Sequence, residues 1–333
     1  MDPLALALLP GIGPKRLLEL LEAENPVESL KARFPQAAGF WTEAVARAEA
    51  ERQRAAALGF RILGLWEEGF PEGLRRLPQP PTHLYLKGDL PEEGRAVALV
   101  GTRRASSWAL AFARRLAREL AEAGLYVVSG LARGVDREAH LGALEGGGRT
   151  LGVLGSALDR LYPPEHRALA ERMDLLSEFP LGTGPKPEFF PRRNRLIAGL
   201  CRAVVVVEAP LDSGALITAR YALELGKEVL AVPGRPTDPG SLGANRLIQD
   251  GAYPVLSAED VLSYLGFAPG RREEPALSPE EAELYALLRQ GEVLPEDLAG
   301  ALGLPAERVL ALLALLELKG LARPLPGGRY GAG

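Results

Sequence analysis

The stretch AVALVGTRRASSWALAFARRLARELAEAGLYVVSG, from Ala96 to Gly130, decides the fold class. It opens with an apolar strand, AVALVG, continues with a helical run over Ala109–Ala123, and closes with a second apolar strand, LYVVSG. Short apolar strands separated by a helix are typical of a parallel sheet covered on both faces. Both strands end in glycine, at the carboxyl edge where open parallel sheets bind their ligands.

The same alternation continues along the chain. The segments TLGVLG, LLSEF, AVVVVEA and EVLAVPG indicate further strands. The helices expected between or after them are Val135–Glu145, Pro164–Met173, Arg195–Leu200, Ala215–Leu225 and Ala244–Gln249. We therefore predict an α/β fold, a Rossmann-like parallel sheet with helices on both faces.

The segments on either side of this core differ from it in pattern. Residues 1–58 contain short amphipathic helices, with a tight PGIG turn early in the chain, which we interpret as a helix–helix corner. Residues 59–267 form the α/β domain, which begins with a proline-rich extension, Phe60–Asp89, where one strand is expected at His83–Leu86. Residues 268–278 are charged and rich in Pro and Gly, as in a linker.

Residues 279–333 indicate a winged-helix domain. The expected elements are helices at Glu280–Arg289, Pro295–Leu302 and Pro305–Lys319, followed by a two-stranded wing. Between Ala276 and Gly333 eight acidic residues exceed five basic ones, so the pattern does not support DNA binding by this domain. Its partner is left unknown.

Composition sets further limits. The chain has 333 residues, a formal net charge of −4 and a single cysteine, Cys201, so no disulfide can form within the chain. This fits a reducing compartment, and with neither a signal peptide nor a bilayer-spanning run in the sequence we expect a cytoplasmic protein without membrane contact. The net charge does not indicate nucleic-acid binding, but a local cationic groove is compatible with this net charge.

Cationic and small residues follow the strand ends. Gly101–Arg104 (GTRR) and Ser129–Gly134 (SGLARG) place exposed N–H groups and arginines where an anion would bind. A third strand-end loop carries Arg160, although there a rigid loop is an equally good interpretation. Ser213 and Gly214 open a further helix in the same way.

The segment FFPRRNR, Phe189–Arg195, adds aromatic rings to this set. Adjacent aromatics usually face opposite ways, so one of Phe189 and Phe190 could stack an unpaired base beside the arginines. A mononucleotide pocket needs the same groups, and the segment alone does not decide between them. No P-loop, no metal-ligand spacing and no nucleophile–base set is found in the sequence, so no metal, no cofactor and no enzyme activity is expected.

At these residues the chain resembles the DNA-processing protein A family, also called DprA or Smf. GTRRAS, SGLARGVDREAH, GSALDRLYPPEH, FPRRNRLIAGLCRAVVVVEA and SGALITAR are similar to its motifs in order, and the resemblance covers about Phe60 to Leu265. The N-terminal helices are similar to the SAM-like or helix-hairpin-helix domain of many members, and the C-terminal segment to the winged helix of some.

The resemblance implies a recombination mediator that protects incoming single-stranded DNA and loads RecA on it during natural transformation. It also implies a homodimer made through the Rossmann-like domain. The family's DNA-contacting arginine falls at Arg103 or Arg104. The DNA-binding residues expected in all are Gly101, Thr102, Arg103, Arg104, Ser129, Gly130, Arg133, Gly134, Arg160, Lys186, Phe190, Arg192, Arg193, Asn194, Arg195, Ser213 and Gly214.

Two other functions compete with this interpretation. The first is a nucleoside-monophosphate-binding or -hydrolysing enzyme of the lysine-decarboxylase-like Rossmann superfamily, whose catalytic glutamate would stand about where this chain has Arg220. A cation at that position suits anion binding better than glycosidic chemistry. The second is a scaffold that joins partners through its terminal domains, which leaves the clustered arginines unexplained.

Overall fold

The computed structural model describes residues 1–267, 277–289, 291–319 and 321–332. Contacts divide the chain into two compact units, Met1–Pro269 and Gly270–Gly333. The predicted linker, 268–278, lies outside the described residues from 268 to 276. The boundary predicted between residues 58 and 59 falls inside the first unit and stays a prediction.

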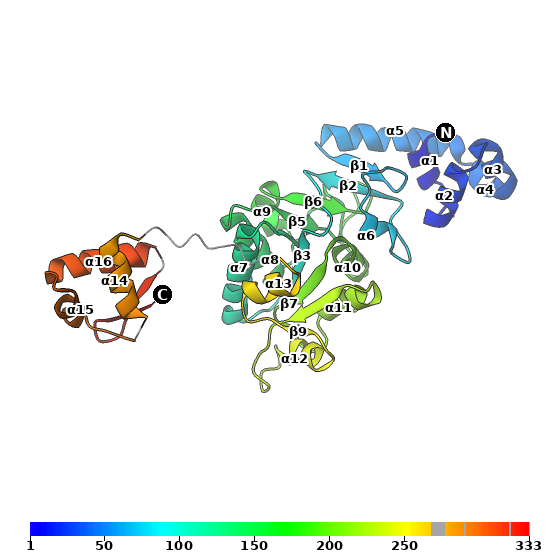
Figure 1. The fold of residues 1–333 in the computed structure, drawn as a ribbon. Helices are drawn as coiled ribbons and strands as arrows, with labels where there is room; N and C mark the ends of the chain where they lie inside the picture. The colour runs from blue at the N-terminus through cyan, green and yellow to red at the C-terminus, as the bar shows by residue number, and fades with distance from the viewer. Residues whose placement is uncertain (268–276, 290, 320, 333) are drawn as a thin grey trace. The chain divides into compact units, whose positions relative to one another are not determined.

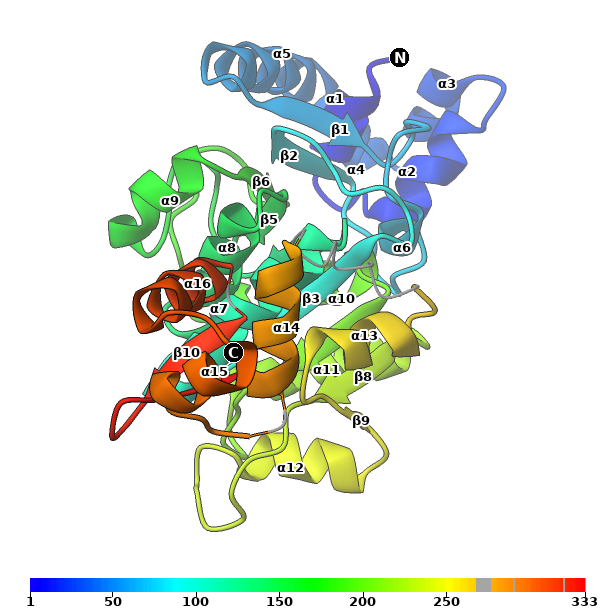
Figure 2. The ribbon, with the colours of Figure 1, turned by 60° about the vertical axis from the view of Figure 1, so that its left-hand side comes forward.

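The N-terminal part of the first unit is helical. Its helices are α1 (Pro3–Ala7), α2 (Pro14–Leu21), α3 (Pro26–Arg33), α4 (Pro35–Ala38) and α5 (Trp41–Ala57). The PGIG turn makes the corner between α1 and α2, with Gly11 at φ +74° and the Arg16 guanidinium donating to the Gly11 carbonyl at 2.7 Å. Helix α5 lies beside the first strand in both Figure 1 and Figure 2.

The first unit is built on a sheet of nine strands among the described residues, in the order β1-β2-β6-β5-β4-β3-β7-β8-β9. Pairing is parallel from β6 across to β9, which confirms the expected parallel core. The strands are β1 (Arg61–Gly64), β2 (His83–Lys87), β3 (Ala96–Val100), β4 (Tyr126–Ser129), β5 (Thr150–Val153), β6 (Asp174–Ser177), β7 (Ala203–Val206), β8 (Glu228–Ala231) and β9 (Tyr253–Pro254).

The proline-rich extension differs from the prediction. It supplies two strands rather than one, and both β1 and β2 pair antiparallel, which makes the whole sheet mixed. A hairpin can add to an edge in this way because antiparallel neighbours need no crossover helix. The pattern of residues 61–64 is too short and too irregular to have indicated a strand.

Helices cover both faces of the sheet, as Figure 1 shows. The apolar residues of α7 (Ser107–Glu122), α8 (Val135–Glu145) and α13 (Ala258–Tyr264) pack in one cluster on one face. Those of α6 (Glu72–Arg75), α10 (Phe189–Leu200) and α11 (Gly214–Glu224) pack in a second cluster on the other. The remaining elements are the 3-10 turn η1 (Pro164–His166), α9 (Arg167–Glu171) and α12 (Leu242–Gln249).

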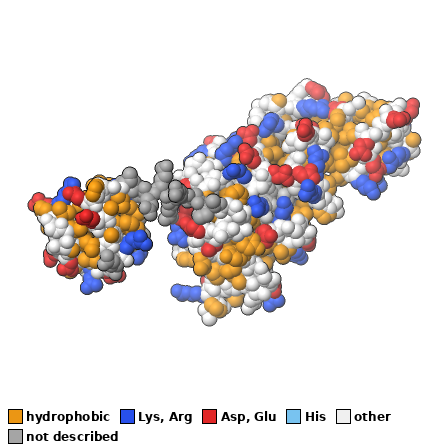
Figure 3. All heavy atoms as spheres, viewed as in Figure 1, with side chains coloured by type: hydrophobic (Ala, Val, Ile, Leu, Met, Phe, Trp, Pro, Cys, Tyr) orange, Lys and Arg blue, Asp and Glu red, His pale blue; other side chains and the backbone are white. Residues whose placement is uncertain are grey.

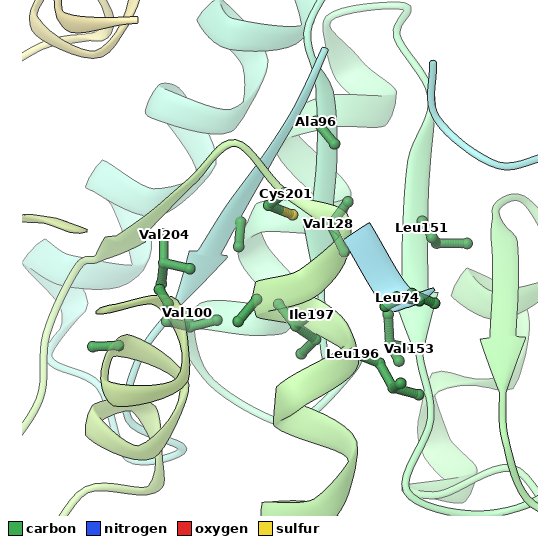
Figure 4. Close-up of a cluster of buried hydrophobic side chains, with 14 of the residues drawn as sticks. Leu74, Ala96, Val100, Val128, Leu151, Val153, Leu196, Ile197, Cys201 and Val204 are labelled. Atoms are coloured by element: carbon green, nitrogen blue, oxygen red, sulfur yellow. The ribbon is translucent and has the colours of Figure 1, made fainter. Parts of the chain in front are cut away.

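Helix α10 contains the range that the sequence indicated and extends beyond it. We expected Arg195–Leu200 to lie within a helix, and that helix starts at Phe189. Pro191 is compatible with this because the first-turn N–H groups of a helix have no partner within the helix. Figure 4 shows Leu196 and Ile197 of α10 among the core residues of the strands. This packing fixes the rotation of α10 and hence the face on which each arginine lies.

The second unit has the predicted winged-helix elements. They are α14 (Pro279–Leu288), α15 (Pro295–Leu302), α16 (Ala306–Leu318) and a wing of β10 (Ala322–Leu325) and β11 (Arg329–Ala332). Its core is made of leucines from all three helices. In the parts of the chain described, no single helix is long and apolar enough to span a membrane; α15 and α16 meet that test only as a pair bent by 110°.

Candidate functional site

The strand order places the candidate site at the carboxyl end of β3. The chain leaves β3 toward β4 on one side, and β7 follows on the other side of β3. The connections therefore diverge between β3 and β7, and this switch point is where open α/β sheets form a ligand crevice. A cavity of about 700 Å³ lies there.

The cavity, which we call the cleft, is lined by the loops that follow β3, β4, β5, β6 and β7 and by residues of α8, α10 and α11. Ten of the residues expected from the sequence line it: Gly101, Thr102, Arg103, Arg104, Lys186, Phe190, Arg193, Asn194, Ser213 and Gly214. Gly130 and Arg133 line a small adjoining pocket of about 20 Å³ that shares Arg103 and Phe190 with the cleft. Four cations, Arg103, Arg104, Lys186 and Arg193, face two carboxylates, Asp136 and Asp212, in the lining, so the cleft favours anions.

The other five expected residues lie elsewhere. Arg192 and Arg195 lie three residues apart and share one face of α10, but that face is turned away from the cleft. Both pair with the buried carboxylate of Glu178, Arg192 at 2.9 Å. Helix periodicity explains this, since residues two and five positions after Phe190 fall on the opposite side of the helix from it.

Ser129, Gly134 and Arg160 are the remaining three. The Ser129 hydroxyl is buried and donates to the Leu99 carbonyl at 2.6 Å, so it ties β4 to β3. Gly134 has φ +77°, and a Cβ there would lie 2.3 Å from the Thr102 carbonyl oxygen, so this glycine is needed for packing the two loops. Arg160 is exposed and does not line the cleft.

Phe190 and Arg103 form the centre of the cleft wall. The Arg103 guanidinium lies over the Phe190 ring, 4.9 Å from its centroid, and the ring of Tyr162 is 5.7 Å away at a tilt of 54°. Phe189 turns the other way and stacks on Phe179 at 4.3 Å, so the two adjacent aromatics do split. Because Arg103 covers Phe190, the surfaces open to a base are the Arg103 guanidinium and Tyr162, which is 37% exposed.

Tyr162 is a site residue that sequence reasoning left out of the expected set. It follows the third strand-end loop and precedes two prolines, in a segment where a rigid loop was an equally good interpretation. An aromatic residue at the carboxyl edge was the available signal. Thr218 and Asp212 also line the cleft and were not expected.

Two buried side chains of opposite charge, Arg193 and Asp136, form the base of the cleft. Arg193 is 4% exposed and donates to the carbonyls of Gly130, at 2.6 Å, and Val153. Asp136 accepts from the backbone N–H groups of Gly130 and Ala132. Burial lowers the pKa of Arg193 to about 10 and raises the pKa of Asp136, while the attraction between the two charges opposes both shifts. Arg193 thus braces the ends of β4 and β5 against α10.

Helix N-termini meet at this edge, and they are not equivalent. At α7, the buried Glu208 carboxylate accepts from the N–H and hydroxyl of Ser106, both at 2.8 Å. At α11, Ser213 caps the helix and no acidic residue lies in the first turn, which opens into the cleft. Of these two ends, α11 is therefore the one available to an external anion.

Titratable side chains outside the cleft lining also have structural partners. Asp159 pairs with Arg54 at 2.6 Å and accepts from the Gly182 N–H. His140 is buried, its Nδ1 lies 2.7 Å from the Thr150 hydroxyl, and burial lowers its pKa to about 3. Arg220 is exposed on α11 and does not line the cleft. Within the described ranges no group of three or more His, Cys, Asp or Glu side chains could hold a metal ion.

Comparison with known families gives two matches. Residues 61–266 match the family model described as DNA recombination-mediator protein A, and residues 267–328 match the DprA winged helix domain. Protein Smf of Synechocystis sp. is 31% identical over 386 residues, covering 98% of this chain and 97% of the relative. Protein Smf of Escherichia coli is 39% identical over 278 residues, covering 78% and 74%.

Two solved structures share the fold. The X-ray structure of DNA processing protein A from Streptococcus pneumoniae aligns with a TM-score of 0.61 at 34% identity, over 74% of this chain and 84% of that one. A structure of DNA processing protein A from Helicobacter pylori, described as showing its single-stranded DNA binding mode, aligns with a TM-score of 0.55 at 31% identity, over 62% and 95%.

Proposed function

Since the chain belongs to the DprA/Smf family of DNA recombination mediators, we propose that its cleft binds single-stranded DNA. The observation that carries the proposal is the arrangement of Arg103, Phe190 and Tyr162, which offers a fixed guanidinium plane and an exposed ring in a cationic cleft. Stacking surfaces beside cations are what single-strand binding requires. The Helicobacter pylori relative, described as binding single-stranded DNA, is consistent with it.

The proposed binding mode uses charged groups for phosphates and planar groups for bases. Arg103, Arg104, Lys186 and the N-terminus of α11 attract phosphates, because they are the accessible positive groups of the cleft. Unpaired bases stack on the open face of Arg103 and on Tyr162. Duplex DNA keeps its bases stacked inside and cannot use these surfaces, so the cleft prefers single strands and reads little sequence.

We propose that Arg192, Arg195 and Arg160 contribute less to binding than the sequence alone suggested. Arg192 and Arg195 are neutralised in part by Glu178 and lie across α10 from the cleft. Arg193 acts as a brace rather than as a contact, because its guanidinium is buried and bonded to strand-end carbonyls. The DNA contacts we retain are the expected cleft-lining residues other than Arg193, together with Gly130 and Arg133 at the margin of the cleft.

The cellular role we propose is protection of incoming single strands and loading of RecA during natural transformation, by a cytoplasmic homodimer. Support for the dimer comes from the open edge of β9, where Tyr253, Leu256 and Tyr264 are 40%, 67% and 41% exposed. Figure 3 shows apolar side chains gathered on the surface near β9 and α12.

We also propose that the protein is not an enzyme. The two carboxylates in the cleft lining are poorly suited to act on a glycosidic bond: Asp136 is buried and accepts from two backbone N–H groups, and Asp212 lies exposed. A nucleoside-monophosphate hydrolase needs a carboxylate free to do chemistry. Nucleoside monophosphate hydrolysis is therefore assayed together with DNA binding.

The test is a titration of labelled oligo-dT and of a matching duplex with wild type, Arg103→Ala and Tyr162→Ala, with nucleoside monophosphate hydrolysis assayed on the same samples. We expect single strands to bind better than duplex, both variants to bind more weakly, and no hydrolysis. Hydrolysis of a monophosphate without oligonucleotide binding would overturn the proposal in favour of the enzyme. The proposed loading of RecA is tested by measuring RecA filament formation on single-stranded DNA with and without this protein.

A further inference from the structure

Trp108 is an exposed tryptophan at the start of α7, outside the residues that line the cleft. Its side chain is 51% exposed, whereas tryptophan is on average among the more buried residue types. The chain has three tryptophans, and the other two, Trp41 and Trp66, are partly buried against the N-terminal helical core. The exposed indole ring of Trp108 is therefore available to contact a ligand.

The ring is held in place on one side only. It stacks on Phe112, one helical turn further along α7, with centroids 5.4 Å apart and an interplanar angle of 21°. Phe112 is itself buried and packs in the core beneath α7. One face of Trp108 is therefore supported by a fixed ring while the rest is open to solvent, which is the form of a stacking platform with little entropy to lose.

Its position continues the cleft. Arg103 and Arg104 line the cleft, and Trp108 follows Arg104 by four residues, a separation of at most roughly 14 Å along the chain. Side chains in a helix lean toward its N-terminus. The N-terminus of α7 lies at the carboxyl end of β3, so the Trp108 ring lies at the same edge of the sheet as the cleft.

Positive charge is present on both sides of the ring along the chain. Arg104 precedes it, exposed, and the Arg115 guanidinium lies over the supporting Phe112 ring at 5.4 Å. Arg115 makes no ion pair with any residue that the structure describes. The N-terminus of α7 is closed by the Glu208 carboxylate, so these arginines, and not the helix end, supply the attraction for phosphates.

We propose that Trp108 is a second base-stacking platform, which receives the nucleotides of a single strand that leaves the cleft past Arg104. The inference rests on the proposed function and extends it. The ligand is any unpaired nucleobase of a DNA strand, without sequence preference, because every base has a face to stack. A strand that only fills the cleft does not reach Trp108, so its contribution depends on the length of the DNA.

Tryptophan emission gives a direct test. The emission of wild type minus that of Trp108→Phe reports on Trp108 alone, because Trp41 and Trp66 contribute to both. A long oligo-dT should quench this difference signal, and a short one of about six nucleotides, which fills only the cleft, should leave it unchanged. Anisotropy of the labelled DNA, read on the same samples, shows independently whether the DNA is bound.

Substitution supplies the second measurement. Trp108→Leu should weaken binding of the long oligo-dT by roughly tenfold and leave the short one unaffected, since one stacked base is lost. Trp108→Phe should retain most of the affinity because it keeps an aromatic face. Phe40→Ala is the matched control: Phe40 is also an aromatic residue at 51% exposure, but it lies in the N-terminal helical part. Thermal unfolding of each variant identifies any loss of fold.

The outcomes are separable. If anisotropy reports binding of the long oligo-dT while the Trp108 signal and the Trp108→Leu affinity are unchanged, the platform is wrong and the proposed cleft function stands. If neither length binds, the proposed function itself fails. If Trp108→Leu lowers only the unfolding temperature, Trp108 serves to cover Phe112 and the proposal is overturned.

Discussion

The salt dependence of DNA binding tests the charge count of the cleft. Three cations that line it are exposed, Arg103, Arg104 and Lys186, whereas the fourth, Arg193, is buried and bonded to strand-end carbonyls. If each exposed cation neutralises one phosphate of a single strand, log Kd should change with log salt with a slope of about 2.1, at ~0.7 per contact. Raising salt from about 50 to about 200 mM should then weaken binding roughly 18-fold.

Replacing Arg103 by glutamine removes one contact. The slope should fall to about 1.4, and the same rise in salt should weaken binding only about sevenfold. Arg103→Lys keeps the charge but loses the plane that lies on Phe190, so it should keep the slope of wild type and bind more weakly at every salt concentration. The pair of variants separates the phosphate contact from the stacking surface.

The assay is anisotropy of labelled oligo-dT at five or more salt concentrations. Arg246→Gln is the control, an exposed arginine on α12 that pairs with Asp250 at 3.1 Å and does not line the cleft. Arg192→Gln should also leave the slope unchanged, because Arg192 lies on the far face of α10 and pairs with Glu178. A slope that Arg103→Gln leaves intact and Arg192→Gln lowers would refute the assignment of the cleft as the DNA site.

Three further predictions concern the buried Arg193, the two buried histidines and the aromatic ring of Tyr162. Arg193→Met should lower the free energy of unfolding by roughly 3–5 kcal/mol, because two buried strand-end carbonyls lose their donor and the buried Asp136 carboxylate loses a nearby positive charge; urea unfolding checks this, and a loss below ~1 kcal/mol would contradict it. Burial lowers the pKa of His140 to about 3 and that of His83 to about 4. As the pH falls below 6.5, these two histidines therefore become protonated in the unfolded chain before they do so in the folded protein. Each histidine should therefore lower the free energy of unfolding by roughly 3 kcal/mol between about pH 6.5 and pH 4. His140→Asn should make the free energy of unfolding depend less on pH over this range, as measured by urea unfolding at several pH values. Tyr162→Leu should weaken oligo-dT binding roughly tenfold while Tyr162→Phe binds nearly as wild type; equal affinities for the two variants would exclude stacking on this ring.

The sequence predicted most of the fold because its elements carry strong local signals. The apolar strands from Ala96 onward and the amphipathic helices between them differ in period, and glycines mark where the strands end. Helix α8 was predicted with its observed bounds, and the winged-helix elements within a residue or two. The edge hairpin was only half predicted, because β1 has no pattern of its own and forms by pairing with β2.

The sequence predicted the kinds of residue that make up the candidate site more reliably than it predicted which individual residues line it. Cations and glycines after parallel strands must gather at one edge of the sheet, so the cleft-lining residues of the GTRR loop and of α11 could be named in advance. Arg192 and Arg195 could not be separated from Phe190, because the first residue of the helix and its rotation against the sheet were unknown. Starting α10 at Phe189 would have placed them on its far side.

By itself, then, the sequence determined the fold class, the order of strands and helices along the chain, and the edge at which charged and small residues collect. These follow from interactions within each segment and from the rule that parallel strands share a direction. Only the tertiary structure decided that β7 lies beside β3 to open the crevice, that Arg103 covers Phe190, and that Glu178 takes Arg192 and Arg195. Those outcomes depend on how α10 packs across the sheet, a contact between segments far apart in the chain, which local pattern does not encode.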